Sequence, residues 1–350
     1  MTMTRRGLVA SAAVTGTLAL WQAEIVSAMA EAATPAKEPA VKDPAVKEPV
    51  VKGPVVKDQP LHQVSPHVFM IEAPDGFPTP ENQGLMSNIT FVVAKHGVVV
   101  VDSGASLQIA EMAIRQLRTL TRAPVVGIIN THYHGDHWLG NHGFVEAYGS
   151  GFPIYAHAGT RQAIEGNSGT FWHDSMLKWT SDATAGTRIV PPTMSVDNGF
   201  TIPLGDVTLR LHHYGQAHTH SDIAVEIVDD HVVCVGDIMM DRRIANMDDG
   251  SYKGTLNTIE LLIKNCKPEA WVPAHGDAGM KVLEWHRSLF MGIYESCVTA
   301  VKQNIPLEGA LAVALKDPRV SGKATETRGW EKNIGKYVSI AYLEAEQDLF

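Results

Sequence analysis

Three histidines and one aspartate fall within six consecutive positions, shortly after the apolar run 125–129: His132, His134, Asp136 and His137. Side chains alternate in an extended strand end, so His132 and His134 point to the same side and can bind one ion. Asp136 and His137 follow where the chain turns, and can reach a second ion. These ligand types suit Zn²⁺, and less often manganese, iron or cobalt. A polar surface loop is the alternative, but it would need four strong ligands to cluster by chance.

Three further ligand-type residues follow apolar runs later in the chain: His218, Asp237 and His275. Loops at strand ends, held by a rigid sheet, are where catalytic side chains are usually placed. Each residue is a weak indication alone. Together they indicate that seven ligands converge on one site.

The order of these residues resembles the metallo-β-lactamase superfamily, whose pattern is His-x-His-x-Asp-His, then a later His, an Asp or Cys, and a final His. The resemblance covers residues 61–278 well and the rest of the chain only loosely. It implies an α/β fold of the αββα sandwich type: two β-sheets face to face, helices outside, and the metals at one edge. Beyond the sandwich we expect a helical C-terminal extension.

The same resemblance assigns the seven ligands to two zinc ions per chain. It implies that His132, His134 and His218 hold the first ion and that Asp136, His137 and His275 hold the second, with Asp237 bridging them.

Asp237 discriminates among branches of the superfamily. Family members that hydrolyse antibiotics lack a bridging aspartate at this position, whereas glyoxalase II-like thioesterases, lactonases and related hydrolases have one. The resemblance therefore argues against antibiotic resistance as the main role. Cys234 lies close before Asp237 in the sequence. Alternation along a strand puts the two on opposite faces, so we expect Cys234 in the core.

Metal ions around one water lower its pKa to about 7, which supplies hydroxide at neutral pH. The same ions polarise an electrophile and stabilise an oxyanion, so no Ser-His-Asp triad is required. Asp136 is expected both to bind metal and to orient the attacking water or carry its proton. Asp102 and Asp222 are expected to hold ligating histidines in the correct tautomer. For Asp102 a helix N-cap is the open alternative.

Three side chains are candidates for a substrate pocket. Trp138 and Trp172 could form an apolar wall, because the family places variable loops over the substrate where residues 159–195 fall. His220 is the third, as a near neighbour of His218. Packing in the core is the open alternative for the tryptophans.

Residues 1–30 are predicted to be a signal peptide of twin-arginine type. Arg5 and Arg6 precede the apolar run 8–21 and the small-residue site 28–30. The run is too short and too rich in Ala, Thr and Gly for a membrane anchor. A periplasmic or secreted protein without a membrane span is expected, and an uncleaved N-terminus is the alternative.

Residues 31–60 are predicted to be a linker in which a five-residue unit beginning with proline repeats. Proline at every fifth position forbids helix and sheet, so an extended, semi-rigid spacer is expected. The catalytic domain then comprises residues 61–350, enough for one core. Within it, strands are expected at 68–72, 89–94, 97–102, 200–203, 207–214, 223–228 and 231–236, and helices at 107–121, 256–265, 280–303, 307–316 and 330–346.

Composition mainly excludes partners. A net charge of −9 with 19% charged residues offers no basic face for nucleic acid. Three cysteines, odd in number and widely spaced, require no disulfide framework. The C-terminal helices are expected to cap the site or to form the interface of a homodimer.

Three functions follow in order. The first is an exported binuclear zinc hydrolase that acts on a small ester, lactone or thioester. The second is a hydrolytic dehalogenase that releases chloride from an activated chloroaromatic, because a dehalogenase acting on chlorothalonil also resembles this superfamily. The third is a periplasmic metal-binding accessory protein without turnover, which the complete ligand set disfavours, since a pure binder needs no open water position.

Overall fold

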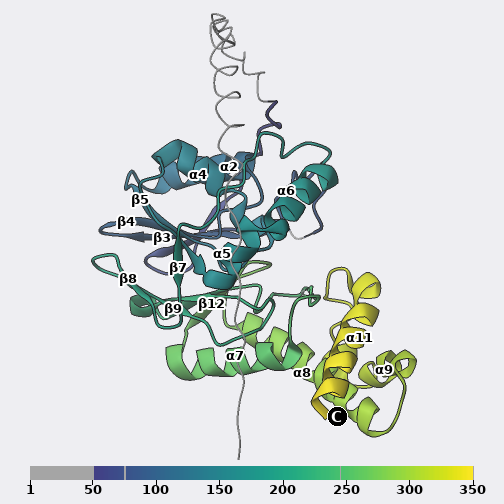
Figure 1. The fold of residues 1–350 in the computed structure, drawn as a ribbon. Coiled ribbons are helices and arrows are strands. Elements are labelled where there is room, and N and C mark those ends of the chain that lie inside the picture. Colours follow the sequence, from purple (N-terminus) through teal and green to yellow (C-terminus); the bar gives the residue numbers. More distant parts are fainter. Residues whose placement is uncertain (1–50, 75, 245, 350) are drawn as a thin grey trace, which may run out of the picture. The chain divides into compact units, whose positions relative to one another are not determined.

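The structure, a computed structural model, describes residues 51–74, 76–244 and 246–349. The predicted signal peptide and most of the predicted linker lie outside the described residues. The described part of the chain builds two β-sheets with helices on their outer faces (Figure 1).

The larger sheet contains strands β1 to β7 in chain order. Each consecutive pair from β1 to β4 is antiparallel, and each consecutive pair from β4 to β7 is parallel. Their bounds are β1 Leu61–Gln63, β2 Val68–Ile71, β3 Ile89–Ala94, β4 Gly97–Val101, β5 Val125–Ile129, β6 Ile154–His157 and β7 Met194–Val196.

The smaller sheet has the order β12-β11-β10-β9-β8. Only the β11–β12 pair is parallel. Its strands are β8 Thr201–Pro203, β9 Thr208–His212, β10 Ala224–Ile227, β11 Val232–Gly236 and β12 Ala270–Pro273.

Apolar side chains from both sheets form one core between them. Val99 of β4 and Ile129 of β5 belong to the same buried cluster as Leu211 of β9 and Val225 of β10. All five residues of β4 are buried, as expected for a strand covered on both faces. Cys234 lies in this cluster, so the prediction that it is a core residue is confirmed.

Helices cover both outer faces, which confirms the predicted αββα sandwich (Figure 1). A second apolar cluster joins the larger sheet to the helices on its side. That side carries α2 Leu107–Leu120, α4 Asn141–Tyr148, α5 Ala158–Glu165 and α6 Asn167–Trp179, and the smaller sheet is covered by α7 Tyr252–Cys266. The segment 159–195, expected to consist of loops, thus begins with two helices. The remaining short elements are α3 Gly135–Trp138 and the 3₁₀ turn Val228–Asp230.

The predicted helical extension is also present. It comprises α8 Lys281–Lys302, α9 Leu307–Ala314, α10 Pro318–Ser321 and α11 Trp330–Leu349. These helices share an apolar cluster of their own that includes Leu289, Ile293 and Val338. Tyr252 at the start of α7 joins that cluster and donates a hydrogen bond to the Tyr337 carbonyl at 3.2 Å. No helix within the described ranges is long and apolar enough to cross a membrane.

Residues 51–60 correct the linker prediction. They form neither helix nor strand, as the prolines require, yet they are not a free spacer. Val56 is buried in the same cluster as α2. Arg115 of α2 donates to the Val56 carbonyl at 2.7 Å and to Asp58 Oδ1 at 2.6 Å. The packed body therefore begins before residue 61.

Gly53 fixes the position of this segment. Its N–H donates to the Ala185 carbonyl at 2.9 Å, in the loop that follows α6. A Cβ at residue 53 would lie 2.0 Å from the Ala183 carbonyl oxygen, closer than any real contact. Only the repeat unit that ends in glycine therefore fits here.

Candidate metal centre

The loop after β5 carries the first four ligand-type residues. His132 and His134 lie between the end of β5 and α3, and Asp136 and His137 lie in the single turn of α3. All four are buried, with His132 and His137 fully inaccessible. The Ser87 hydroxyl donates to the backbone carbonyl of Asp136 at 2.6 Å and holds the turn in place.

Asp237 reaches the same place from the smaller sheet. It follows Gly236, the last residue of β11, where the backbone has a positive φ of 52°. A Cβ on Gly236 would lie 2.7 Å from Thr131 Oγ1, so glycine allows the two loops to approach closely.

The structure brings four of the predicted ligands into a first group. The ligand atoms of His132, His134, His218 and Asp237 all lie within 4.8 Å of one another. His134 Nδ1 is 3.0 Å from His218 Nε2. Asp237 Oδ2 is 3.3 Å from His218 Nε2 and 3.8 Å from His132 Nε2.

The other three form a second group. Asp136 Oδ2 lies 3.3 Å from His137 Nε2 and 3.4 Å from His275 Nε2. Asp237 faces this group with its other oxygen: Oδ1 is 3.4 Å from His275 Nε2 and 3.6 Å from His137 Nε2. The two oxygens of one carboxylate thus point to different groups, which is the placement expected of a bridging ligand.

Within the described part of the chain, several of these buried atoms have no hydrogen-bond partner: His132 Nε2, His137 Nε2, Asp136 Oδ2 and Asp237 Oδ1. Leaving such an atom unsatisfied costs about 1–3 kcal/mol, more if it is charged. His132 Nε2 belongs to the first group and the other three atoms face the second, so a cation in each group would satisfy them. A donor set of imidazole and carboxylate fits zinc. The residues present therefore fit two divalent ions.

The pKa shifts of several ligand-type residues favour the binding of cations. Burial alone would raise the pKa values of Asp136 and Asp237, but the facing histidines, His137 and His275, hold both well below the usual value. Burial lowers the pKa of His218 to about 3, which leaves a neutral ring with a free lone pair. Burial also lowers the pKa of His137, but nearby carboxylates outweigh it and raise the pKa. A bound ion and the second proton therefore compete for His137 Nε2.

Hydrogen bonds on the far nitrogens orient the rings. Asp102 Oδ2 lies 2.9 Å from His137 Nδ1, and the same carboxylate accepts from the Thr131 N–H at 2.8 Å. His275 Nδ1 donates to the Met86 carbonyl at 2.7 Å. Such contacts turn each Nε2 lone pair toward the metal side. Asp102 is thus placed behind a ligand histidine, whereas the N-cap of α2 is Ser106.

Asp222 requires a correction. Its carboxylate accepts a hydrogen bond from the Thr219 N–H at 2.7 Å, so it holds the backbone of the His218 loop rather than a histidine ring. Among the described residues, His218 Nδ1 and Asp222 Oδ1 both lack a hydrogen-bond partner. Burial raises the pKa of Asp222 to about 7.

Asp249 is a further carboxylate beside the first group. Tyr133 donates its hydroxyl to Asp249 Oδ2 at 2.9 Å, and the same oxygen lies 3.8 Å from His134 Nε2. The nearby His134 ring and the hydrogen bond from Tyr133 lower the pKa of Asp249 to about 2 despite partial burial. This carboxylate supports His134 from behind. Nothing in the local sequence around residues 248–250 points to that role.

The three residues predicted to line a substrate pocket lie in different environments. Trp138 is fully buried and donates its indole N–H to the Tyr133 carbonyl at 2.9 Å, so its prediction as a pocket residue is wrong. The turn of α3 directs it into the core under the larger sheet. Trp172 is half-buried on α6, with its ring centroid 4.8 Å from that of His134. His220 is exposed, and its ring centroid is 5.3 Å from that of Tyr133.

Trp172 belongs to a row of aromatic rings that leads away from the metal centre. Its centroid lies 5.5 Å from Phe171 and 6.0 Å from Trp179, and Trp179 lies 4.8 Å from Phe77. Phe77 and Phe171 are 60% and 58% exposed, so the row ends at the surface.

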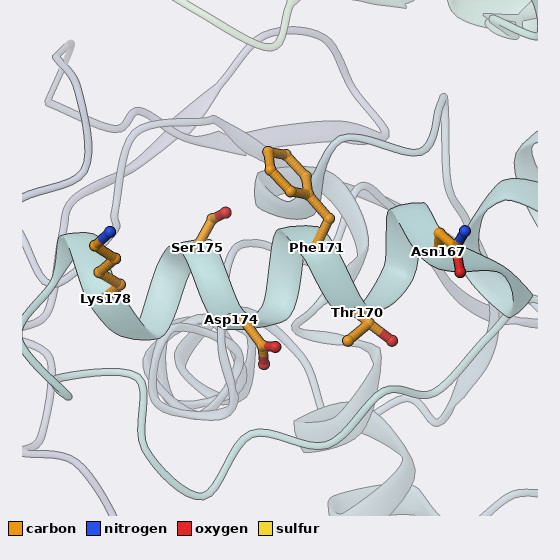
Figure 2. Close-up of a pocket in the computed structure, with 6 residues that line it drawn as sticks. All are labelled: Asn167, Thr170, Phe171, Asp174, Ser175 and Lys178. Atoms are coloured by element: carbon orange, nitrogen blue, oxygen red, sulfur yellow. The ribbon is translucent and has the colours of Figure 1, made fainter.

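A groove of about 390 Å³ lies along α6 but does not reach the metal ligands. Figure 2 shows its six lining residues, all from this one helix: Asn167, Thr170, Phe171, Asp174, Ser175 and Lys178. None of them is a ligand-type residue of the two groups, so this groove is not the candidate site.

The sequence model of the metallo-beta-lactamase superfamily matches residues 82–314. This is well over half of the chain, and the chain belongs to that superfamily. Members of the superfamily are generally hydrolases, and this chain carries two groups of residues suited to metal.

Solved structures agree with this assignment. A metallo-beta-lactamase from Pontibacter korlensis has a TM-score of 0.52 and 21% identity, over 66% of this chain and 98% of that chain. The DIM-1 metallo-beta-lactamase, in a structure exposed to ceftazidime, has a TM-score of 0.51 and 15% identity, over 67% and 97%. TMB-1 gives 0.51 and 15%, over 67% and 98%. At these identities the similarity shows the fold alone.

Proposed function

We propose that the chain is an exported, binuclear zinc-dependent hydrolase of the bridging-aspartate branch, similar to glyoxalase II and lactonases, that acts on a small ester, lactone or thioester. The observation that carries this proposal is the placement of Asp237. Its Oδ2 faces His218 Nε2 at 3.3 Å and its Oδ1 faces His275 Nε2 at 3.4 Å, so one carboxylate serves both ligand groups.

Zinc ions bound to the two groups would supply a nucleophilic water at neutral pH and polarise the bond to be cleaved. The protein's own contribution is orientation and proton handling. Asp102 and the Met86 carbonyl fix the rings of His137 and His275. Asp136 is the carboxylate between those two rings, and is placed to orient the attacking water and relay the proton that it loses.

The surroundings favour turnover over metal storage. The ligands are buried, with His134 only 6% exposed, whereas the aromatic row from Trp172 to Phe77 continues to the surface. Such a row gives an apolar substrate a binding surface that leads to the ions. A metal-binding accessory protein has no need of it.

The aromatic row also favours a second candidate, hydrolytic dehalogenation of an activated chloroaromatic. Flat aromatic rings pack well against Trp and Phe side chains in offset or edge-to-face geometry. In this reaction the water oxygen forms a bond to the ring carbon, the carbon–chlorine bond breaks, chloride leaves, and the water protons pass through Asp136 to solvent.

The decisive experiment measures acid and chloride release by zinc-loaded protein, with a chelated control. The panel contains a lactone, a thioester, an aryl ester, a cephalosporin and a chlorinated aromatic nitrile. Acid without chloride supports the acyl hydrolase, and chloride release supports the dehalogenase. Preferential cleavage of the cephalosporin would contradict the proposed branch, and a completely silent panel would favour the accessory protein.

Export is a separate part of the proposal and rests on residues 1–30 alone. We expect cleavage near Ala30 and recovery of the mature chain from the periplasm or medium. Mass spectrometry of the exported protein checks this, with a chain in which Arg5 and Arg6 are both changed to Lys as the export control. An intact Met1 on periplasmic protein would contradict it.

A further inference from the structure

A second cluster of ligand-type side chains lies outside the metal centre, between the smaller sheet and α7. His212 ends β9, Glu226 lies on β10, and Cys266 is the last residue of α7. They are 5%, 4% and 5% exposed. Their ligand atoms lie within 4.8 Å of one another, as in the catalytic groups. The proposed reaction uses none of the three.

Two of these groups approach the same nitrogen. Glu226 Oε2 lies 2.8 Å and Cys266 Sγ 3.4 Å from His212 Nε2. A catalytic triad would place its nucleophile and its acid on opposite nitrogens of the histidine, so this is not a nucleophilic relay. Instead the three groups converge on one point. Tetrahedral zinc separates nitrogen and sulfur ligands by about 3.5 Å, and would widen the nitrogen–oxygen pair to about 3.4 Å.

The other ring nitrogen of His212 has a hydrogen-bond partner of its own, a tyrosine hydroxyl in place of the carboxylate or carbonyl that is usual behind a metal-ligating histidine. Its Nδ1 lies 3.0 Å from the Tyr214 hydroxyl, which accepts a hydrogen bond from Asn265 Nδ2 at 2.8 Å. This contact anchors the ring with Nε2 turned toward Glu226 and Cys266.

We propose that His212, Glu226 and Cys266 form a third metal site, for a zinc-like divalent ion that ties the end of α7 to the smaller sheet. Mixed nitrogen, oxygen and sulfur ligands suit zinc. Burial raises the pKa of the Cys266 thiol to about 12, so binding releases the thiol proton to solvent as the metal–sulfur bond forms. Arg210 lies 3.2 Å from Glu226 Oε2, so the ion would share this carboxylate with a guanidinium, and binding with release of the thiol proton adds one positive charge to the cluster. Because β9 leads into the His218 loop, the ion would brace the strand that positions a catalytic ligand.

Cobalt substitution of the full chain tests this site apart from catalysis. The two catalytic groups contain no cysteine, so a sulfur-to-cobalt charge-transfer band can arise from this cluster but not from them. We expect the band in the unaltered chain, its loss in Cys266→Ser, and its retention in Cys297→Ser. Cys297 is a matched control because it is buried in α8 and donates to the Val338 carbonyl at 3.5 Å.

Metal content provides the second readout: Cys266→Ser should bind one equivalent of zinc less than Cys297→Ser. Absence of the band in the unaltered chain, or an equal band in Cys266→Ser, would show that the cluster is only a hydrogen-bonded network. Should Cys266→Ser not fold, alkylation of Cys266 in the unaltered chain decides instead. Zinc must slow that alkylation relative to a chelated sample, and equal rates would overturn the proposal.

Discussion

The metal centre and the C-terminal helices bury their polar groups in opposite ways. Within the described ranges, the seven candidate ligands include five buried side-chain atoms without a hydrogen-bond partner, whereas α8 to α11 include one, His286 Nε2. In the helices, the buried Tyr337 and Tyr342 donate their hydroxyls to carbonyls at 3.1 and 2.9 Å. The difference indicates that one region is organised around a ligand and the other around its own packing.

Removing a ligand should have the largest effect. We expect His134→Ala to lose metal from the first group and to reduce turnover to the chelated background, because no neighbour replaces its Nδ1 beside His218. Metal analysis and product release measure this. His62→Ala, at an exposed histidine on β1, is the control and should retain both. Full turnover by His134→Ala would contradict both the proposed function and the conclusion that this region is organised around a metal ion.

A packing change in the helices should act on stability alone. Ile293 is fully buried in α8, so Ile293→Ala is expected to lower the free energy of unfolding by about 2–5 kcal/mol. The turnover of the remaining folded protein should be unchanged. Urea unfolding and activity per folded molecule separate the two effects. Leu315→Ala, at a 40% exposed position in the same region, should change stability by less than about 0.5 kcal/mol.

Substitution of a residue that supports a ligand should have an intermediate effect on metal affinity and activity. We expect Asp102→Asn to lower metal affinity or activity about 10- to 100-fold, since the amide holds His137 Nδ1 less firmly than a carboxylate does. Competition with a chelator measures the affinity. Asp197→Asn, at a 92% exposed side chain, is the matched control. Equal affinity in the two variants would mean that His137 needs no support.

The smallest effect should come from a pair outside both regions. His67 Nδ1 lies 2.7 Å from Asp230 Oδ1 and joins the two sheets. The hydrogen bond with Asp230 raises the pKa of His67, so its contribution is fully present below about pH 6.5 and is lost as pH rises through the raised value. Burial alone would raise the pKa of Asp230, but hydrogen bonds from Ser65 and His67 lower it, so its contribution is lost only in acid.

The test compares unfolding of the unaltered chain and His67→Gln at several pH values. We expect the difference between them to shrink as pH increases from mildly acidic to alkaline. A difference that grows with pH would contradict the sign of the shift. The metal content of both chains should stay equal throughout.

Much of the fold and the ligand set could be predicted from local sequence. His132 and His134 are two apart at a strand end, and the long apolar runs define the strands of both sheets. Asp237 and His275 were identifiable because each follows such a run. These features depend on neighbouring residues, which sequence patterns record directly.

The residues that sequence patterns misplaced or missed are those positioned by packing between segments far apart in the chain. Trp138 adjoins the motif, but the turn of α3 directs its ring into the core. Asp249 meets Tyr133 and His134 only because the loop before α7 folds back onto them. The His212 cluster likewise exists only once the end of α7 lies on β9 and β10.

Gly53 determines which residues of the repeat segment pack against the rest of the protein. A whole five-residue unit added or deleted between residues 39 and 48 leaves the same residues packed against α2. A single-residue insertion between Gly53 and Val56 would instead place a side chain against the Ala183 carbonyl. The number of whole repeat units ahead of residue 49 can therefore change without altering the spacing between Gly53 and Val56 on which the packing depends.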